Sequence, residues 1–371
     1  MNEKRVGVLN FPHFMNYGAA LLSYALIRVM DKLPGVRAEL INYRPINYTS
    51  FYPLWWNFDF WGQSAILKQR FIKTEQLFRE FHMRYNRMDS NILHTITAGE
   101  YDYCCIGADK TWDYYFANCH RFEHLLPHVP ANVNKIAYGI SMGDELENMP
   151  ETLFGNDPYA KYLPLFKAIS VREKEIIPFV EEKSGKHIPC VLDPTLLLDA
   201  EDFFPIIADR KEKPDQPYLV VYYLDVMGED RLEEVIQLSN LIARKYGLKV
   251  IHTIYNERGN RFYNNGGNMI SGGVEDFIWY MKNASFVVTN TYHGTIFSIQ
   301  FERPFYVFPQ KKDTRIRTLR SYTDFNDRCV GQHMMTYDEI NLDVDFAKIK
   351  HDVYSYREDS MRFLKNALDI E

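Results

Sequence analysis

The sequence predicts two α/β domains, each a doubly wound, Rossmann-like parallel sheet, with a C-terminal helix that packs back on the first domain. Short apolar strands alternate with longer segments of helical period, which is typical of βαβ units. The alternation runs twice, and a charged, proline-bearing stretch at 209–217 separates the two runs. The 371 residues also exceed one domain of about 150. We expect a first domain over 1–208, completed by 346–371, and a second over 209–345.

The first run begins with a strand at 5–11, a helix at 17–32 and a strand at 36–43. Apolar residues at helical spacing predict a further helix at 66–84. Further β-branched, apolar segments predict strands at 103–107, 135–141, 168–172 and 188–192.

The second run predicts strands at 218–224, 249–253, 285–289 and 304–308. Helices are expected between them, at 230–246, 274–283 and 293–300. The last segment, 346–367, has the pattern of one amphipathic helix, and we expect it to return to the first domain.

Charge and cysteine content exclude several classes of protein. The 43 Lys and Arg against 49 Asp and Glu give a net charge of −6, which argues against a nucleic-acid binder. Five cysteines, an odd number that includes the adjacent Cys104 and Cys105, do not form a disulfide framework and favour a reducing cytoplasm. We expect no secretory signal, because a strand begins within a few residues of Met1. The longest stretch without charged residues, 283–301, is too often interrupted by polar residues for a membrane span.

The segment 43–61 is unusual because nine of its nineteen residues are aromatic, including three of the five tryptophans. It is either a packed insertion that caps the first domain or a platform for a sugar ring or its lipid carrier.

The first strand-to-helix turn, residues 10–20, lies where doubly wound folds bind ligands. It lacks the glycines of a dinucleotide fingerprint, and the chain contains no P-loop. Asn16 either caps the helix or, with His13, makes polar contacts with a ligand. Gly18 either allows close helix–sheet packing or lets the ligand approach the backbone.

Two further strand ends carry charged residues. Asp109 and Lys110, in the sequence 106–113, form either a solvated turn or a polar site for sugar hydroxyls, with a carboxylate base. Arg172 ends an apolar strand, so it either pairs with a carboxylate such as Glu173 or binds a ligand carboxylate or phosphate.

The strongest local signal is Val287-Val-Thr-Asn-Thr-Tyr-His-Gly-Thr-Ile-Phe-Ser298. A buried strand leads into a polar turn where His293 and Gly294 begin a helix, which Thr291 or Thr295 can cap. Because a helix N-terminus attracts anions and histidine transfers protons near neutral pH, we interpret this turn as functional.

A basic segment at 311–320 follows the strand after the His293 helix. It contains Arg315 and Arg317 on a helix that Asp313 or Thr314 begins, with Ile316 and Leu319 on its buried side. It is either a solvated face or part of an anion site.

The segments 16–26, 106–112, 170–173, 192–198 and 289–298 together resemble the polysaccharide pyruvyl transferase family, in the same order along most of the chain. The resemblance implies a fold like the GT-B glycosyltransferases. It also implies transfer of pyruvate from phosphoenolpyruvate to two hydroxyls of a sugar of a cell-surface polysaccharide precursor, giving a cyclic ketal.

The resemblance also suggests residue roles. His293 is the expected general acid or phosphate ligand, Asp109 the base toward the acceptor, and Arg172 a third catalytic group. Donor binding is expected of Arg172, Thr291, His293, Gly294, Thr295, Arg315 and Arg317. Acceptor binding is expected of His13, Asn16, Gly18, Asp109, Lys110 and Trp112. Thr291 stands where some members of the family have arginine, so the basic residues after Lys311 would have to hold the donor.

We expect no cofactor besides phosphoenolpyruvate as co-substrate, and no metal, because metal-binding motifs are missing from the sequence. The acceptor would be a nucleotide- or lipid-linked sugar, through which the protein could associate peripherally with a membrane. Two alternatives remain: a GT-B glycosyltransferase that uses a nucleotide sugar, and a sugar-binding protein whose catalytic site has decayed.

Overall fold

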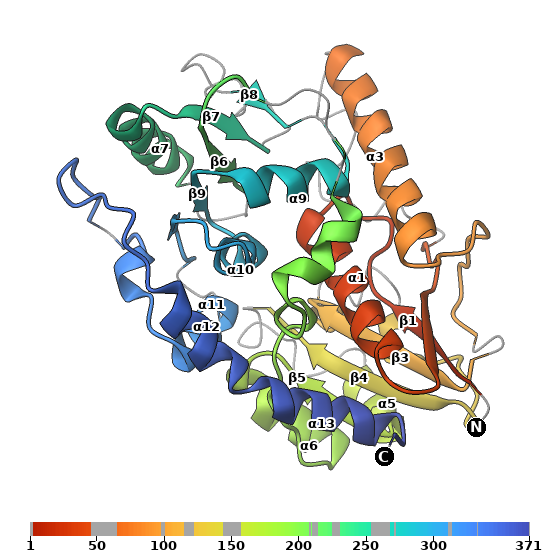
Figure 1. The fold of residues 1–371 in the computed structure, drawn as a ribbon. Coiled ribbons are helices and arrows are strands. Elements are labelled where there is room, and N and C mark those ends of the chain that lie inside the picture. The colour runs from red at the N-terminus through yellow and green to blue at the C-terminus, as the bar shows by residue number, and fades with distance from the viewer. Residues whose placement is uncertain are drawn as a thin grey trace. The chain divides into compact units, whose positions relative to one another are not determined.

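The computed structural model describes residues 3–45, 65–97, 101–114, 122–143, 157–207, 209, 214–224, 231–253, 268–270, 272–310, 314–331 and 333–370 (Figure 1). The chain forms two compact units. Unit 1 comprises Met1–Tyr52, Phe78–Leu198 and Tyr354–Glu371, and unit 2 comprises Pro53–Leu77 and Asp199–Val353. The aromatic segment 43–61 lies outside the described residues from position 46 onward, so its function stays a prediction.

Unit 1 contains a five-stranded, fully parallel sheet. Its strands, in spatial order, are β2 (Val36–Leu40), β1 (Lys4–Leu9), β3 (Tyr103–Asp109), β4 (Asn134–Ile140) and β5 (Ala168–Val171). Because all five strands are parallel, their carboxyl ends meet at one edge of the sheet. The strand order reverses at β1, which lies between β2 and β3, so the switch point is between β1 and β3.

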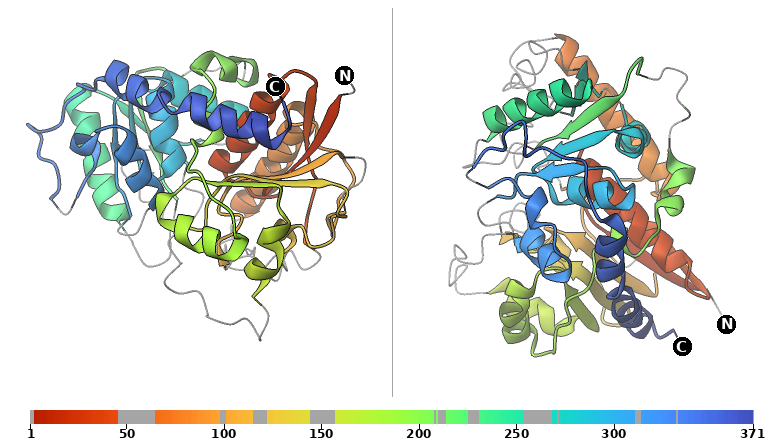
Figure 2. Two further views of the ribbon diagram at one scale, coloured as in Figure 1. Left: turned by 90° about the horizontal axis from the view of Figure 1, so that it is seen from below. Right: turned by 60° about the vertical axis from the view of Figure 1, so that its left-hand side comes forward.

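Helices cover both faces of this sheet (Figure 2). α1 (Tyr17–Asp31) lies on one face, and a Cβ at Gly107 would meet Cδ2 of Leu26 at 2.1 Å, so β3 and α1 pack without room for a side chain. α5 (Pro158–Tyr162) and α6 (Ile177–Ser184) cover the other face, where Cys104 belongs to their apolar core. Alternate strand residues thus serve two cores, as the period of a strand requires.

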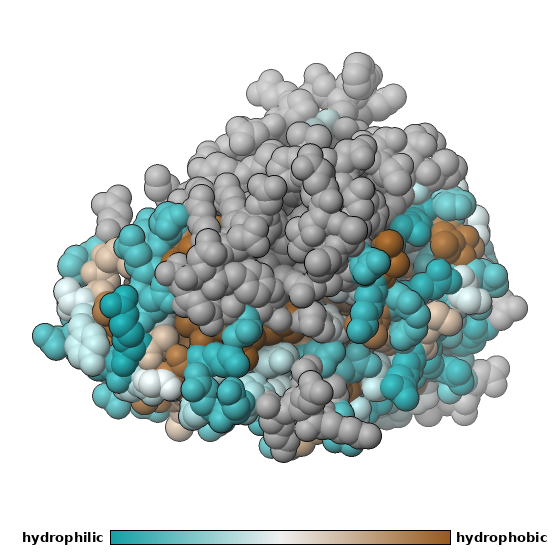
Figure 3. Space-filling view, turned by 90° about the horizontal axis from the view of Figure 1, so that it is seen from above, coloured by the Kyte–Doolittle hydropathy of each residue, from teal (hydrophilic) through white to brown (hydrophobic). Residues whose placement is uncertain are grey.

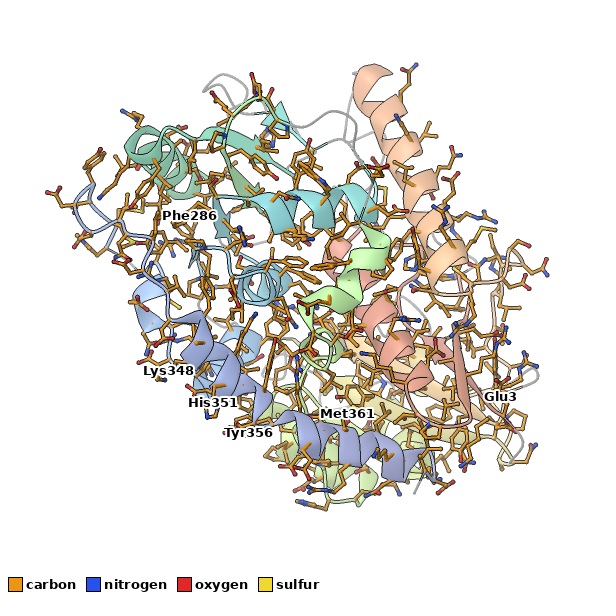
Figure 4. All side chains as sticks on the ribbon, in the orientation of Figure 1. Glu3, Phe286, Lys348, His351, Tyr356 and Met361 are labelled. Carbon is orange, nitrogen blue, oxygen red and sulfur yellow. The ribbon has the colours of Figure 1, made fainter. Side chains whose placement is uncertain are left out.

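The C-terminal segment forms two helices, α12 (Phe346–Tyr354) and α13 (Arg357–Ala367), where the sequence predicted one. α13 packs on unit 1: Phe363 contacts the ring of Tyr138, and Leu364 is fully buried. Glu358 and Asp359 follow the break at once, and acidic residues stabilise a new helix N-terminus. Figure 4 labels residues along both helices.

The strand expected at 188–192 is wrong. Cys190 makes one isolated bridge to Val171, and the flanking residues extend no ladder. Pro189 precedes it and Pro194 soon follows, and proline cannot donate a ladder hydrogen bond.

Unit 2 contains a second five-stranded parallel sheet. Its strands, in spatial order, are β10 (Phe305–Val307), β9 (Phe286–Thr289), β6 (Tyr218–Tyr222), β7 (Lys249–His252) and β8 (Asn268–Met269). This is the Rossmann strand order, with the switch point between β6 and β9. The sequence missed β8, because two residues are too short to show a period.

Helices also cover both faces of the second sheet. α7 (Leu232–Tyr246) packs on the face that holds Leu219 and Val288, and α9 (Val274–Asn283) packs on the other, where Phe277 meets the ring of Tyr222 at 4.8 Å. α10 (Tyr292–Gln300) follows β9, and α11 (Thr314–Tyr322) follows β10. The two doubly wound α/β units confirm the predicted fold class.

Within the described ranges, the remaining helices are α3 (Ala65–Tyr85) and the short 3₁₀ helices η2 (Glu123–Leu125), η4 (Leu163–Leu165), η5 (Lys174–Ile176), η6 (Pro194–Leu196), η7 (Ala200–Ile206) and η8 (Asn326–Arg328). On the face in Figure 3, the described surface is mainly hydrophilic with smaller apolar areas. Among the described residues, none of the helices has the length and hydropathy needed to cross a membrane.

Candidate functional site

The turn between β9 and α10 stands at the switch point of unit 2 and is held by a relay of hydroxyl groups. The Gly294 N–H donates to Thr291 Oγ1 at 2.9 Å, which lies 2.9 Å from Thr289 Oγ1. Thr289 Oγ1 donates to the Tyr222 carbonyl on β6 at 2.7 Å. Each hydroxyl has one proton, so Thr291 must donate to Thr289. The relay ties the first turn of α10 to the end of β6.

Gly294 packs directly against the two threonine hydroxyl groups of this relay. A Cβ at position 294 would lie 2.3 Å from Thr289 Oγ1 and 2.6 Å from Thr291 Oγ1. Both distances are far below a van der Waals contact, so a larger residue would break the relay. The glycine is therefore required by close approach within the turn.

His293 lies in the first turn of α10, a nine-residue helix capped by Thr291. Its side chain is held among its neighbours, with 7% of the residue exposed and the Tyr292 ring at 5.4 Å. A helix N-terminus concentrates positive potential, which favours an anion beside the imidazole. His293 thus has the surroundings that the sequence predicted, although its contact with a ligand stays a prediction.

The hydroxyl groups of Thr291 and Thr295 both make hydrogen bonds within the turn. Thr291 uses its hydroxyl as the helix cap, and Thr295 is fully buried with its hydroxyl donating to the Thr291 carbonyl at 3.0 Å. The donor contact expected of Thr295 therefore does not fit this structure, because its hydroxyl is enclosed and engaged.

Asn290 is a residue of this turn that the sequence analysis did not single out. Its Oδ1 accepts from the Leu224 N–H at 2.9 Å, and its Nδ2 donates to the Leu224 carbonyl at 2.7 Å. It is 6% exposed. An asparagine directly after a buried strand was the available signal, but only the strand order brings Leu224 beside it.

The basic helix α11 begins at Thr314, and Ile316 and Leu319 are buried as predicted. Arg315 is half-buried and Arg317 is exposed. Residues two apart leave a helix on different sides, about 200° from each other, so the two arginines do not share one face. We therefore expect one of the two arginines, and not both, to contact a given ligand group.

Asp109 ends β3 at the switch point of unit 1, in strained backbone. Ala108 has φ 35° and Asp109 φ 66°, which are left-handed values that residues other than glycine rarely adopt. The Asp109 carbonyl accepts from Thr111 and Ser141, and this holds the conformation. Such strain accumulates at functional sites, where the surrounding structure maintains it.

Arg172 adopts the first of its two predicted alternatives, pairing with carboxylates. Its Nη1 lies 2.6 Å from Asp193 Oδ2, its Nε 3.6 Å from Glu173 Oε1 and its Nη2 3.9 Å from Asp109 Oδ1. Arg172, Asp193 and Glu173 are buried, and the side chain of Asp109 alone reaches solvent, with 15% exposed. The guanidinium therefore bonds to Asp193 and lies within ion-pair distance of Asp109, and its expected contact with a donor stays a prediction.

The loop after β3 also brings Lys110 and Asp113 to one point. A Cβ at Gly143, which follows β4, would lie 2.9 Å from Lys110 Nζ and 2.7 Å from Asp113 Oδ2. The position of Trp112 differs from the predicted contact with the acceptor. It is fully buried against Phe166 and donates its indole N–H to the His124 carbonyl, so it is a core residue rather than an acceptor contact.

The loop after β1 is built by side-chain contacts to the backbone. Asn16 caps α1 by accepting from the Ala19 N–H at 3.2 Å, and Gly18 is buried in the first turn of that helix. His13 Nδ1 lies 2.9 Å from the Tyr43 carbonyl. Since a carbonyl only accepts, Nδ1 carries the proton there, and the neutral ring has its lone pair on Nε2. His124 also packs against Phe11 of this loop, and no local pattern indicates it, because the two residues are far apart in the chain.

His252 ends β7 at the same edge of unit 2 as the β9–α10 turn. Burial lowers its pKa to about 4, so the ring is neutral at pH 7. Among the described residues, no group of three or more His, Cys, Asp and Glu side chains is placed to hold a metal ion.

Solved structures that resemble the chain include UDP-N-acetylglucosamine 2-epimerases. The S. aureus MnaA–UDP co-structure has a TM-score of 0.55 at 10% identity, covering 99% of this chain and 98% of that one. A putative epimerase of Listeria monocytogenes has a TM-score of 0.54 at 9% identity, covering 100% of this chain and 90% of that one. The epimerase of Methanocaldococcus jannaschii has a TM-score of 0.51 at 14% identity, covering 98% of this chain and 99% of that one. These likenesses identify a GT-B type fold.

None of the curated proteins compared with the chain matches it. The family model described as polysaccharide pyruvyl transferase matches residues 16–311, well over half of the chain. This range begins at Asn16, the cap of α1, and includes the Asp109 and Arg172 strand ends and the β9–α10 turn. The chain therefore belongs to the polysaccharide pyruvyl transferase family.

Proposed function

We propose that this protein transfers pyruvate from phosphoenolpyruvate to two hydroxyls of a sugar, forming a cyclic ketal on a precursor of a cell-surface polysaccharide. Family membership supports the class of transferase. The observation that carries the proposal is the β9–α10 turn, where a histidine lies at a helix N-terminus at the switch point of unit 2. This combination suits an anionic donor that needs a proton.

The reaction balances without an oxidant or reductant. Protonation of the donor's methylene carbon makes it a methyl group and leaves an oxocarbenium-like carbon, which one sugar hydroxyl attacks. The C–O bond to phosphate then breaks, and the second hydroxyl closes the ketal. Of the two protons that leave the hydroxyls, one replaces the proton used at the methyl group and the other leaves on inorganic phosphate.

His293 is our choice for the general acid toward the methylene carbon, or for the group that steadies the departing phosphate. Phosphoenolpyruvate carries roughly −2.5 to −3 charges, because its phosphate contributes about −1.5 to −2. The N-terminus of α10 and one of Arg315 and Arg317 would offset that charge. These groups all belong to unit 2, which we assign to the donor.

Asp109 is our choice for the base toward the acceptor hydroxyl, with the Arg172 guanidinium 3.9 Å from its carboxylate as a neighbouring positive charge. His13, Asn16, Gly18 and Lys110 belong to the same strand edge of unit 1, which we assign to the acceptor. The acceptor would be a nucleotide- or lipid-linked sugar in the cytoplasm, and a lipid carrier would bring the protein to the membrane surface.

The test of the general acid is His293→Gln, which keeps size and hydrogen bonding but cannot transfer a proton. We expect kcat to fall by about 10²-fold or more, measured as phosphate release from phosphoenolpyruvate with a panel of acceptor sugars. His333→Gln, an exposed histidine of the same unit, is the matched control and should leave kcat unchanged. An unchanged kcat with weaker donor binding would make His293 a phosphate ligand.

The chemistry also predicts that no catalytic metal is needed, because proton transfer and fixed positive groups suffice for this donor. Exhaustive chelation should leave phosphate release at its original rate. Loss of activity that Mg²⁺ or Mn²⁺ restores would contradict the assignment.

The second candidate is a GT-B glycosyltransferase that uses a nucleotide sugar. It is favoured by two structural neighbours, one a complex with UDP and the other a putative UDP-N-acetylglucosamine 2-epimerase. Isothermal titration with phosphoenolpyruvate and with UDP-sugars distinguishes the two candidates. Binding of a UDP-sugar as donor, without binding of phosphoenolpyruvate, would replace our proposal. Acceptor binding without turnover of either donor would indicate a sugar-binding protein.

A further inference from the structure

The side chain of Asn290 bridges the switch point of unit 2. The last backbone pair between the neighbouring strands is Tyr222 with Thr289. Beyond it the ladder stops, because β9 turns into α10. The carboxamide of Asn290 then bonds to both backbone groups of Leu224, at 2.9 and 2.7 Å. It therefore takes the place of a peptide group and holds the chain that leaves β6.

This arrangement frees the main chain of the turn from the ladder. With Leu224 held by a side chain, the backbone after Asn290 is free to turn, so that Thr291 caps α10 and His293 follows in the first helical turn. The hydroxyl relay from Thr291 through Thr289 makes a second connection to β6, at the Tyr222 carbonyl. Two independent connections therefore fix the helix start against the neighbouring strand.

We propose that Asn290 is a positioning residue that places His293 and the N-terminus of α10 for the donor's phosphate. The identity of the ligand rests on the proposed function, whereas the contacts of Asn290 with Leu224 do not depend on it. Asn290 lies three residues before His293, and both ends of its carboxamide are bonded to Leu224, so it acts through the turn and not by contact with the donor. A displacement of about 1 Å is enough to cost about 10²-fold in rate at a site of this kind.

The matched pair of variants is Asn290→Ala and Asn283→Ala. Asn283 donates its Nδ2 to the Trp279 carbonyl at 2.9 Å, at the end of α9 in the same unit, and has no bond to the turn. Both variants remove an asparagine side chain that bonds to the backbone. The melting temperature reports the loss of stability in each variant, whereas a shift of the turn affects only Asn290→Ala.

Three readouts are compared: the melting temperature, the affinity for phosphoenolpyruvate and inorganic phosphate by titration calorimetry, and the imidazole resonance of His293, assigned with His293→Gln. We expect Asn290→Ala to weaken both affinities about ten-fold or more and to move the His293 resonance. Asn283→Ala should keep wild-type values for both. An Asn290→Ala protein that melts earlier with unchanged affinities and an unmoved His293 resonance would overturn the proposal.

Two further arms keep the test decisive. If Asn290→Ala does not fold, Asn290→Asp replaces it. Its carboxylate keeps an acceptor for the Leu224 N–H but cannot donate to the Leu224 carbonyl, so the same shift of the His293 resonance is expected. If wild-type protein binds neither phosphoenolpyruvate nor phosphate, the proposed function fails, and the His293 resonance alone decides whether Asn290 positions the turn.

Discussion

At the scale of single residues, the β9–α10 turn is closely packed around Gly294, Thr289 and Thr291. The hydroxyl relay leaves room for a hydrogen atom at position 294 and for nothing larger. In unit 1, Arg172 stands between three carboxylates, and Asp109 alone among them reaches solvent. Removing one partner of a buried ion pair leaves an uncompensated charge, so the pair of Arg172 with Asp193 at 2.6 Å keeps the guanidinium beside Asp109.

Gly294→Ala tests the turn at this scale. Alanine normally stabilises a helix relative to glycine by about 1 kcal/mol, but here its Cβ would overlap Thr289 Oγ1. We expect a net destabilisation of about 1–3 kcal/mol in chemical denaturation, together with loss of phosphate release. Gly331→Ala is the control, because a Cβ there meets nothing within 4 Å. A stabilised Gly294→Ala protein would show that the turn can relax.

At the scale of secondary structure elements, α13 is the clearest case of a helix held by specific polar contacts. Lys4 Nζ donates to the Leu368 carbonyl at 2.7 Å, and the Tyr103 hydroxyl donates to Asp369 Oδ2 at 2.7 Å. Arg357 donates to the carbonyls of Leu196 and Leu198, at 2.6 and 2.7 Å. The first turn of α13 is thereby tied to the segment where the chain leaves unit 1 for unit 2.

Arg357→Ala measures this tie. The variant loses two charge-assisted hydrogen bonds to carbonyls, so we expect a loss of about 1.5–3 kcal/mol in the free energy of unfolding. Arg362→Ala on the same helix is the control, because Arg362 is exposed and its pairs with Glu358 and Asp359 are surface ion pairs. That control should change stability by less than about 1 kcal/mol. Equal effects of the two variants would refute a specific role for Arg357.

At the scale of the whole molecule, each unit buries a histidine that stays neutral. Burial lowers the pKa of His82 on α3 to about 3 and that of His252 at the end of β7 to about 4. The unfolded chain binds protons at these sites near the ordinary value of 6.5, whereas the folded chain does not. Stability should therefore fall as the pH falls from about 6.5 toward 4.

His252→Gln isolates the contribution of one histidine. Glutamine cannot take up the proton, so the variant should lose less stability than wild type between pH 7 and pH 4.5, by up to about 3 kcal/mol. Urea unfolding at the two pH values measures this. His333→Gln is again the exposed control. An identical acid dependence of wild type and His252→Gln would mean that His252 is protonated in the folded protein.

The sequence by itself determined the class of fold and the location of the strand ends. Apolar runs and helical spacing do not depend on distant partners, so most strands and helices were predicted to within a few residues. The carboxyl ends of parallel strands share an edge, which is why Asp109, Arg172 and His293 could be chosen from sequence. The resemblance to the family added the chemistry, which periodicity cannot supply.

Only the tertiary structure decided which of the chosen residues face one another. Arg172 pairs with Asp193, twenty-one residues further along the chain, and Trp112 belongs to the core. Asn290 meets Leu224 across sixty-six residues, because β6 and β9 are neighbours. Local pattern carries no information on such pairs, since strand order and the packing of each sheet face bring them together.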